Sequence, residues 1–234
     1  TDGFGQRGVF RTEYEINNTA LKVSVDDLTL SYRRWELSNG GNGAGGAQVL
    51  DPQGGVEYVT NQYNLGYKST FNDHWMLEVN AGYGEEHGDI DNVLLPVGVY
   101  PIDDGSVNPG NIGNLNPAGI LVSFPEGAIG NPTTDSSITH FDFALTNDSL
   151  NGHVIRAAAG YRYEDFDTSE TKNFGPGVLD PNVITTAPPV TNVSNTPNVF
   201  IPDVNREVQY LSLQDEWQFA NDWSLTLGVR YDNS

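Results

Sequence analysis

The sequence predicts an all-β fold, an antiparallel up-and-down portion of a transmembrane β-barrel with about eight strands in four hairpins. Three observations lead to this prediction. Apolar residues recur at every second position in several segments. The connections between these segments alternate between short and long. Aromatic residues stand at both ends of the clearest apolar rows.

Alternation of apolar and polar residues is the signature of a strand, because successive side chains point to opposite faces. The segments 74–84 and 222–232 follow this pattern most clearly, each from a tryptophan to a tyrosine eight positions later. We expect strands in four pairs: 11–25 with 28–37, 56–68 with 74–87, 138–147 with 153–167, and 206–218 with 223–233.

Short turns rich in Asn, Asp and Gly join the two strands of each pair, as at Asp26-Asp27. Three longer connections, at about 38–55, 88–137 and 168–205, separate the pairs. Structureless loops of this length are uncommon in compact domains. A transmembrane β-barrel accounts for them, because its periplasmic turns are short and its extracellular loops are long. We therefore expect residues 1–234 to form part of a single barrel domain, with no plug domain present.

The aromatic residues fit the two interfaces of a bilayer. In the first of these rows, Trp75 lies beside a short turn and Tyr83 lies toward a long loop. Tyr and Trp favour membrane interfaces, where the ring meets lipid and the polar atom meets water. Eight residues of strand span about 26 Å, or about 20 Å along the normal at a tilt of ~40°, close to the apolar band of outer-membrane barrels. The apolar rows are therefore predicted to face lipid.

Composition narrows the classes of partner. The chain has 11 Lys+Arg against 31 Asp+Glu, a formal net charge of −20, which disfavours nucleic acid because binding phosphates requires basic side chains. It has no cysteine, so disulfides and thiolate metal sites are excluded. No run approaches the ~20 apolar residues of a membrane-spanning helix.

The last predicted hairpin, REVQYLSLQDEWQFANDWSLTLGVRYDN at 206–233, resembles the barrel hairpins of TonB-dependent outer-membrane receptors. The segment GHVIRAAAGYRYEDFDTSE at 152–170 is similar to another strand of such barrels that leads into an external loop. The resemblance implies a location in the bacterial outer membrane, in contact with its lipid. It also implies active uptake of a scarce nutrient of siderophore, cobalamin or oligosaccharide type, powered through a TonB-type energy-coupling protein.

The chain departs from the family pattern in several respects. Such receptors have 22 strands, an N-terminal plug and a short TonB-contacting box ahead of it, whereas this sequence shows eight strands, no plug-like segment and no such box. We expect an internal portion of a receptor barrel, whose partners are the remainder of that barrel and its plug. An open arc of strands with bare edges would otherwise be prone to aggregate.

No group of residues predicts catalysis, and we do not expect an enzyme or a bound cofactor. The four His residues have no partner at the spacing of a nucleophile or metal ligand. The acidic stretch EEHGDIDN is a candidate calcium site in an external loop, because Ca²⁺ takes closely spaced oxygen ligands. Acidic external loops are also common without any ion. The candidate ligands are Glu85, Glu86, Asp89, Asp91 and Asn92.

Four arginines are predicted on the lumen side of the strands: Arg33, Arg156, Arg162 and Arg230. Mutual ion pairing with nearby acids accounts for them, and contact with an anionic substrate is the alternative. Two alternatives to a receptor also stay open. One is a complete eight-stranded outer-membrane barrel with a structural or adhesive role. The other is a secreted, acidic, calcium-binding β-sandwich.

Overall fold

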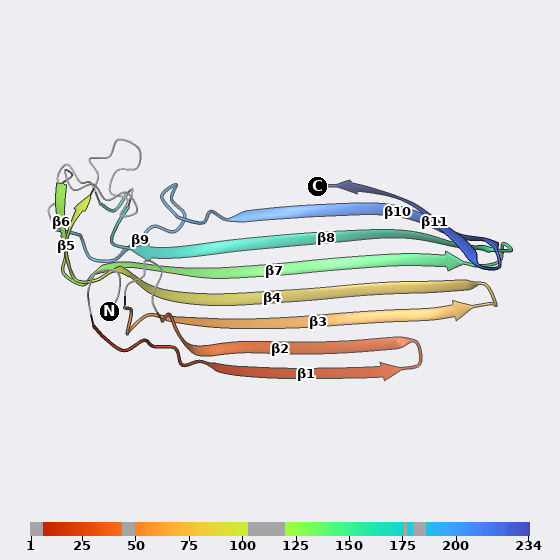
Figure 1. Cartoon of the computed structure of the whole chain (residues 1–234), viewed down its shortest axis with the longest axis horizontal. Helices are drawn as coiled ribbons and strands as arrows, with labels where there is room; N and C mark the ends of the chain where they lie inside the picture. The colour runs from red at the N-terminus through yellow and green to blue at the C-terminus, as the bar shows by residue number, and fades with distance from the viewer. Residues whose placement is uncertain (1–6, 44–49, 103–119, 176, 180–185) are drawn as a thin grey trace.

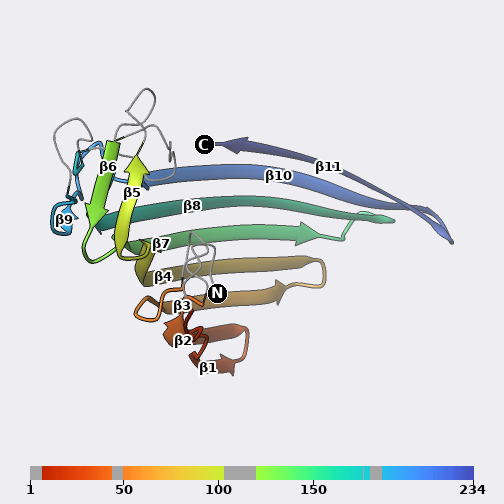
Figure 2. The same ribbon diagram turned by 60° about the vertical axis from the view of Figure 1, so that its left-hand side comes forward.

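One large antiparallel sheet makes up most of the structure, a computed structural model that describes residues 7–43, 50–102, 120–175, 177–179 and 186–234. Eight strands cross this sheet in the order β1-β2-β3-β4-β7-β8-β10-β11, and β9 (Thr191–Asn192) pairs with β8. Figures 1 and 2 show the strands side by side in a single layer. The bounds are β1 Glu15–Val25, β2 Leu28–Gly41, β3 Gly55–Phe71, β4 Trp75–Leu95, β7 Ala128–Asn147, β8 His153–Lys172, β10 Val204–Ala220 and β11 Trp223–Asn233. The predicted all-β, up-and-down fold and its four hairpins are confirmed.

The four short turns lie at one end of the sheet, as predicted (Figure 1). Asp26 and Asn72 adopt left-handed backbone angles, with φ of 50° and 49°, and Gly152 does so with φ of 78°. Asn, Asp and Gly tolerate this region best, which explains their abundance at these positions. The longer connections lie at the opposite end, which we call the loop end.

The central strands are longer than the sequence pattern indicated. β4 has 21 residues, or about 70 Å of extended chain, whereas a membrane strand needs only ~9–11 residues. The expected loop at 88–137 is therefore partly strand, because β4 continues to Leu95 and β7 begins at Ala128. The expected loop at 168–205 likewise begins with the end of β8. Alternation of apolar residues stops where the strands leave the apolar band, but the backbone ladder continues. The parts of the expected loops at 44–49, 103–119, 176 and 180–185 lie outside the described residues.

The sheet has two chemically different faces. The apolar face carries the residues predicted to meet lipid, and on β11 the side chains of Leu227 and Val229 are 61% and 68% exposed. No second sheet covers this face in the described part of the chain, contrary to the β-sandwich alternative. The opposite side, which we call the polar face, carries the intervening residues. On β4 the apolar face comprises Trp75, Leu77, Val79, Ala81 and Tyr83, and the polar face comprises Met76, Glu78, Asn80, Gly82 and Gly84.

The main buried apolar cluster lies at the loop end, away from the middle of the sheet. There β5 (Gly98–Ile102) and β6 (Ile120–Phe124) form a separate two-stranded sheet. Phe124 and Val122 have no exposed surface, and they pack with residues from the second and third long connections, 88–137 and 168–205. The two connections therefore fold together. We call this cluster the loop-end core: Leu95, Val122, Phe124, Ala128, Phe174, Leu179 and Ala187.

A buried ion pair ties β8 to the connection that follows it. The side chains of Lys172 and Glu170 are 1% and 5% exposed, and Lys172 Nζ lies 3.2 Å from Glu170 Oε1. Lys172 Nζ also donates to the carbonyl oxygen of Asn198 at 2.5 Å. The backbone N–H of Phe200 donates to Glu170 Oε2 at 2.6 Å. These contacts fix residues 198–200 against the end of the strand.

β1 and β11 form opposite edges of the large sheet, and no described residues pair them. The sheet is open. The described strands therefore do not form the closed eight-stranded barrel that was considered as an alternative, with a structural or adhesive role. The described residues include no helix that is long and apolar enough to cross a membrane.

Candidate functional site: the polar face of the sheet

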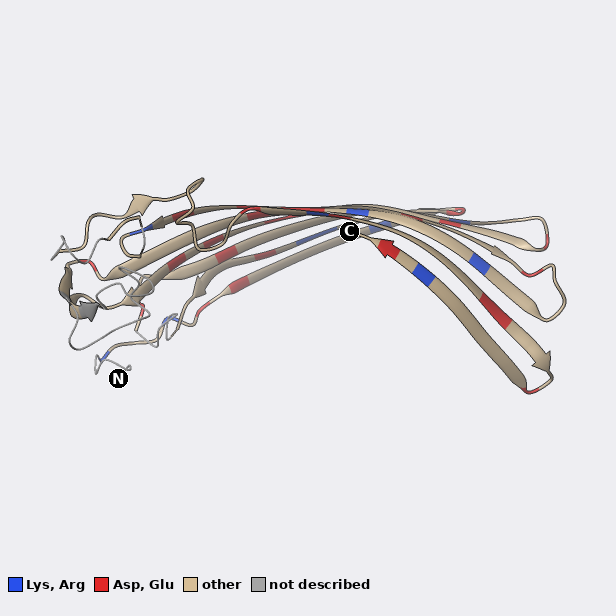
Figure 3. Ribbon diagram, turned by 90° about the horizontal axis from the view of Figure 1, so that it is seen from above, with Lys and Arg blue, Asp and Glu red and all other residues tan. Residues whose placement is uncertain are grey.

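Most basic side chains of this acidic chain lie on the polar face. The chain has 11 Lys and Arg residues in total, and the strand registers place eight of them there: the buried Lys172 at the loop end and seven along the open wall. Figure 3 shows the Lys and Arg positions as separate blue bands along the strands. The positive charge is therefore concentrated on one surface, in contrast to the net charge of −20. The seven are Lys22, Arg33, Lys68, Arg156, Arg162, Arg206 and Arg230.

Glu78 of β4 joins two of these basic side chains. Its Oε1 lies 3.0 Å from Lys68 Nζ on β3, and its Oε2 lies 3.4 Å from Arg156 Nη2 on β8. Arg156 reaches across β7 at Ala144, which is 4% exposed. A small residue on the intervening strand allows an ion pair to span it. The predicted ion pairing of Arg156 is confirmed.

A second network crosses β8 at Gly160. The hydroxyl of Tyr210 on β10 donates to Asp142 Oδ1 on β7 at 2.6 Å. A Cβ at Gly160 would overlap the Tyr210 ring, so glycine is required for this contact. The guanidinium of Arg230 stacks on the same ring, 4.0 Å from its centroid, and pairs with Asp232 at 2.7 Å. Cation–π contact and ion pairing together hold Arg230 over the face.

The pairing of a ring with a glycine directly opposite occurs three times on the polar face. Tyr210 covers Gly160, His140 covers Gly82, and Tyr58 covers Gly88. A ring laid over a glycine shields its backbone, a device that also fixes strand register. Each of the three rings therefore occupies the space that a side chain on the neighbouring strand would take.

Two hollows lie between these networks. One has a volume of about 730 Å³ and is lined by Lys22, Lys68, Glu78, His140, Asp142 and Arg156 among others. The other has a volume of about 660 Å³ and includes three arginines, Arg162, Arg206 and Arg230. Arg206 Nη2 lies 2.7 Å from Glu164 Oε2, and Arg162 pairs with the same carboxylate. The surface offers hydrogen-bond donors and acceptors of both charges to a polar solute.

The structure does not bring the five candidate calcium ligands together. They lie on the extended strand β4 at the loop end, where successive side chains alternate between faces. Glu85, Asp89 and Asp91 share one face, and Glu86 and Asn92 lie on the other. Among the described residues, no group of three or more His, Cys, Asp or Glu side chains is arranged to hold a metal ion. Calcium binding here stays a prediction. Only candidates on the same face of β4 could contact one ion together.

His87 sits in the middle of that stretch and pairs with two acids. Its Nδ1 lies 2.7 Å from Asp135 Oδ1 on β7, and its Nε2 lies 3.1 Å from Asp89 Oδ2. The hydrogen bond to Asp135 is the main reason that the pKa of His87 is raised. Repulsion from Asp165 raises the pKa of Asp167 on β8, which lies on the other side of β7. Both groups lie at the loop end, outside the apolar band.

Sequence reasoning found four of the five arginines of the polar face and missed Arg206 and the partners of all of them. Tyr210 and Asp142 lie 68 residues apart in the chain and meet only through strand order. A tyrosine on the polar side of an alternating strand was the available signal, since Tyr32, Tyr63, Tyr83 and Tyr161 all fall on the apolar side. Gly160 was visible only as an interruption in a strand.

A search of curated proteins found no match to this chain. A comparison with protein families gave one described as TonB dependent receptor-like, beta-barrel, which matches residues 2–234. The match covers nearly the whole chain and agrees with the open antiparallel sheet, its apolar and polar faces and its segregated turns. The chain therefore belongs to the TonB-dependent receptor β-barrel family.

Proposed function

We propose that this chain forms part of an outer-membrane receptor that takes up a scarce nutrient of siderophore, cobalamin or oligosaccharide type. Receptors of this family carry out TonB-dependent transport across the Gram-negative outer membrane, and the family is one of transporters, not of enzymes. The substrate class and the location of this particular chain are the parts that we propose.

One observation carries the proposal: the same strands present an uncovered apolar face and an open, hydrogen-bonding polar face. A sheet in water would bury its apolar side, whereas a barrel wall in lipid exposes it. The polar side then lines the interior, where a solute passes. Tyr210, Arg206 and Arg230 supply donors and a stacking surface to such a solute.

The proposed partners follow from the family. The plug and the remaining strands would complete the barrel, and a TonB-type protein would supply energy through the plug. The open edges at β1 and β11 support the first of these partnerships, because unpaired strand edges in a bilayer are costly.

The experiment is an uptake assay with the intact receptor in its host. Cells with and without the receptor gene, each in the presence and absence of a working TonB protein, would be given labelled ferric siderophores, cobalamin and oligosaccharides. We expect one substrate to be taken up only when both are present. Uptake that persists without TonB would contradict energy coupling. Equal uptake of every substrate without the receptor would contradict transport.

A pair of variants tests whether the polar face contacts the solute. Tyr210→Phe removes the hydroxyl that binds Asp142 but keeps the ring. Tyr231→Phe removes a hydroxyl from the apolar face of the neighbouring strand. We expect Tyr210→Phe alone to change the concentration at which uptake is half-maximal. An equal effect of both variants would contradict a solute path along this wall.

A further inference from the structure

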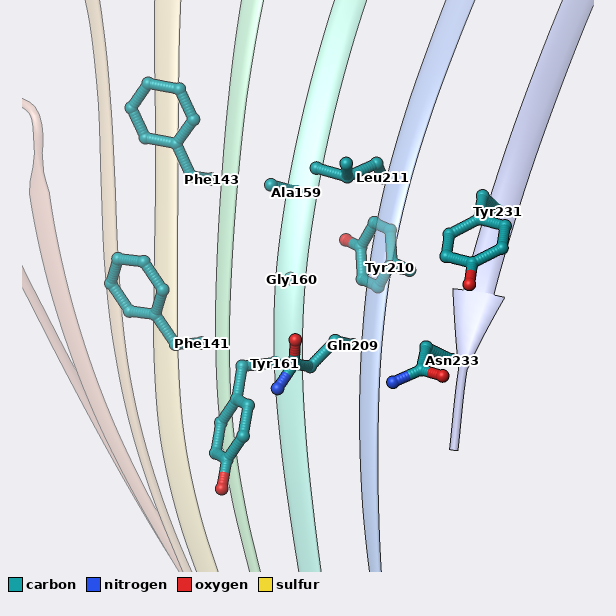
Figure 4. A pocket seen from close by; sticks show the side chains of 10 residues that line it. All are labelled: Phe141, Phe143, Ala159, Gly160, Tyr161, Gln209, Tyr210, Leu211, Tyr231 and Asn233. Atoms are coloured by element: carbon teal, nitrogen blue, oxygen red, sulfur yellow. The ribbon is translucent and has the colours of Figure 1, made fainter.

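The apolar face contains a hollow over β8 that the transport function does not use. Its volume is about 650 Å³. Figure 4 shows aromatic and aliphatic side chains arranged around a small residue, Ala159. The hollow spans two adjacent cross-strand rows on the internal strands β7, β8 and β10 and on β11. The first row is Phe143, Ala159, Leu211 and Tyr231, and the second is Phe141, Tyr161, Gln209 and Asn233.

The hollow exists because the small residue stands between large ones. Ala159 is flanked by Phe143 on β7 and Leu211 on β10. The next row toward the short turns repeats the arrangement, with Ala157 between Leu145 and Leu213. Large side chains on both sides of two successive alanines make a trough that runs along β8. The side chains of the walls project from the sheet, because strand side chains stand roughly perpendicular to it.

The two ends of the trough differ. At the loop end it is closed by the uncharged polar groups of Tyr161, Gln209 and Asn233. Beyond them, the apolar face carries the acids Glu207 and Asp165, and Gln209 Nε2 donates to Glu207 Oε1 at 2.8 Å. No Lys or Arg occupies the apolar face of β7, β8, β10 or β11 among the described residues.

We propose that the trough holds one acyl chain of an outer-leaflet glycolipid. The trough is continuous with the apolar face, which meets lipid in a barrel of this family, so a lipid chain is the molecule that must fill it. The chain lies over Ala159 between Phe143 and Leu211. Its junction with the headgroup is an amide or hydroxyl-bearing sugar that meets Gln209 and Asn233.

Charge favours a glycolipid over a phospholipid at this position. A phosphate at the junction would lie near Glu207 and Asp165 without a basic partner on this face. Like charges repel, and an unpaired anion at a membrane interface is costly. A sugar amide instead exchanges hydrogen bonds with the amide side chains and packs against Tyr161.

The test is the amount of lipid that stays bound to the receptor after extraction from outer membranes in mild detergent, identified by mass spectrometry. Ala159→Phe fills the trough, and Leu28→Phe adds bulk to the apolar face of β2, three strands away from β7 in the sheet order. We expect the first variant to retain about tenfold less glycolipid, the loss expected when one or two methylene contacts are displaced. Leu28→Phe should retain the native amount.

Phe143→Ala, which removes one wall, should also lower retention and serves if Ala159→Phe assembles poorly. Equal retention by the native receptor and both trough variants would overturn the inference, as would recovery of phospholipid as the retained species. The inference rests on the proposed outer-membrane location, with the loop end facing outward, and it does not depend on the nutrient or on energy coupling. Ala159→Phe should leave nutrient uptake unchanged, so loss of the lipid site and loss of transport are separate outcomes.

Discussion

Two ends of the same strands carry opposite chemistry on the face that meets lipid. On β4 the apolar face runs from Trp75 to Tyr83, and at the next positions it carries Glu85 and His87. The hydrogen-bonded ladder to β7 continues through this change without interruption. The backbone N–H and C=O groups are hydrogen-bonded at both ends of the strands. Only the side chains therefore mark the boundary between the lipid and the aqueous side.

The change from apolar and aromatic to charged side chains takes place between two adjacent cross-strand rows. Tyr83 and Tyr163 lie in one row, with Thr139 between them. In the next row, toward the loop end, Glu85 and Asp165 take the same strand positions. A tyrosine row at the junction fits a membrane interface, and charge directly above it meets the aqueous side. The comparison teaches that strand length and membrane span are independent quantities in this chain.

The largest predicted effect is at the loop end, where charge is buried. Lys172→Met removes one partner of the ion pair with Glu170, whose side chain is 5% exposed. An uncompensated buried charge destabilises by about 3–5 kcal/mol. We expect faster hydrogen exchange and proteolysis at residues 170–200, measured by mass spectrometry on the intact receptor.

Lys68→Met is the matched control, since Lys68 also pairs with a glutamate but its side chain is 64% exposed. An exposed pair contributes only ~0–1 kcal/mol. Equal loss of protection in the two variants would mean that the loop end is no more tightly packed than the barrel wall.

The next effect tests the membrane boundary itself. Val79 is the middle of the apolar row of β4, and an arginine there would face the centre of the bilayer. Such a substitution costs about 2–4 kcal/mol at the midplane and much less near the interface. Val79→Arg should lower the free energy of unfolding in lipid vesicles, measured by urea titration. His87→Arg, on the same face beyond the boundary, should have little effect.

The sequence predicted the parts of the fold that depend on local pattern. The eight strands, the short turns and the apolar rows follow from period-two alternation and turn chemistry, which neighbouring residues determine. The strand extensions at the loop end were not predictable in this way. From Glu85 to Leu95 the residues are polar or mixed, and the ladder with β7 alone keeps them extended. β5 and β6 were missed for another reason: each has only five residues, and both lie in a segment that its Pro, Gly and Asn residues marked as a loop.

The polar face was predicted only in part. The four expected lumen arginines lie where alternation placed them, on the polar face. The contacts between them depend on strand order and on small residues such as Ala144 and Gly160, which become bridges for side chains of other strands. Spacing along one strand contains no information about the strands beside it.

Glycines on the polar face provide a smaller effect. A Cβ at Gly82 would overlap the His140 ring, whereas a Cβ at Gly84 on the same face of the same strand would meet only ordinary contacts. Overpacking typically costs about 1–3 kcal/mol. Gly82→Ala should lower the midpoint of urea unfolding, and Gly84→Ala should leave it nearly unchanged. Similar midpoints would show that the His140 ring moves aside freely.

The smallest effect is a pH dependence confined to the loop end. The pKa of His87 is raised above its usual value of 6.5, chiefly by the hydrogen bond to Asp135. A raised folded pKa means that the stabilisation is complete below the unfolded value and is lost as pH rises through the folded value. The pKa of Asp167 is also raised, chiefly by Asp165, and this destabilises the fold as pH rises above the usual value of 3.8. Because of His87, the loop end should be more protected from hydrogen exchange at pH 6 than at pH 8, after correction for the intrinsic rate.

His87→Gln separates the histidine from the surrounding acids. Glutamine keeps a hydrogen bond to Asp135 but does not gain a proton, so the part of the pH dependence due to His87 should disappear. The side chain of His87 is 51% exposed, and solvent screening limits an ion pair of this kind to ~0.2–1 kcal/mol. Residues 75–83, on the membrane side of the boundary, should show no such dependence. If they changed with pH as much as residues 85–91, the charged and apolar ends of β4 would unfold as one unit, and the boundary at Tyr83 would have chemical but no energetic meaning.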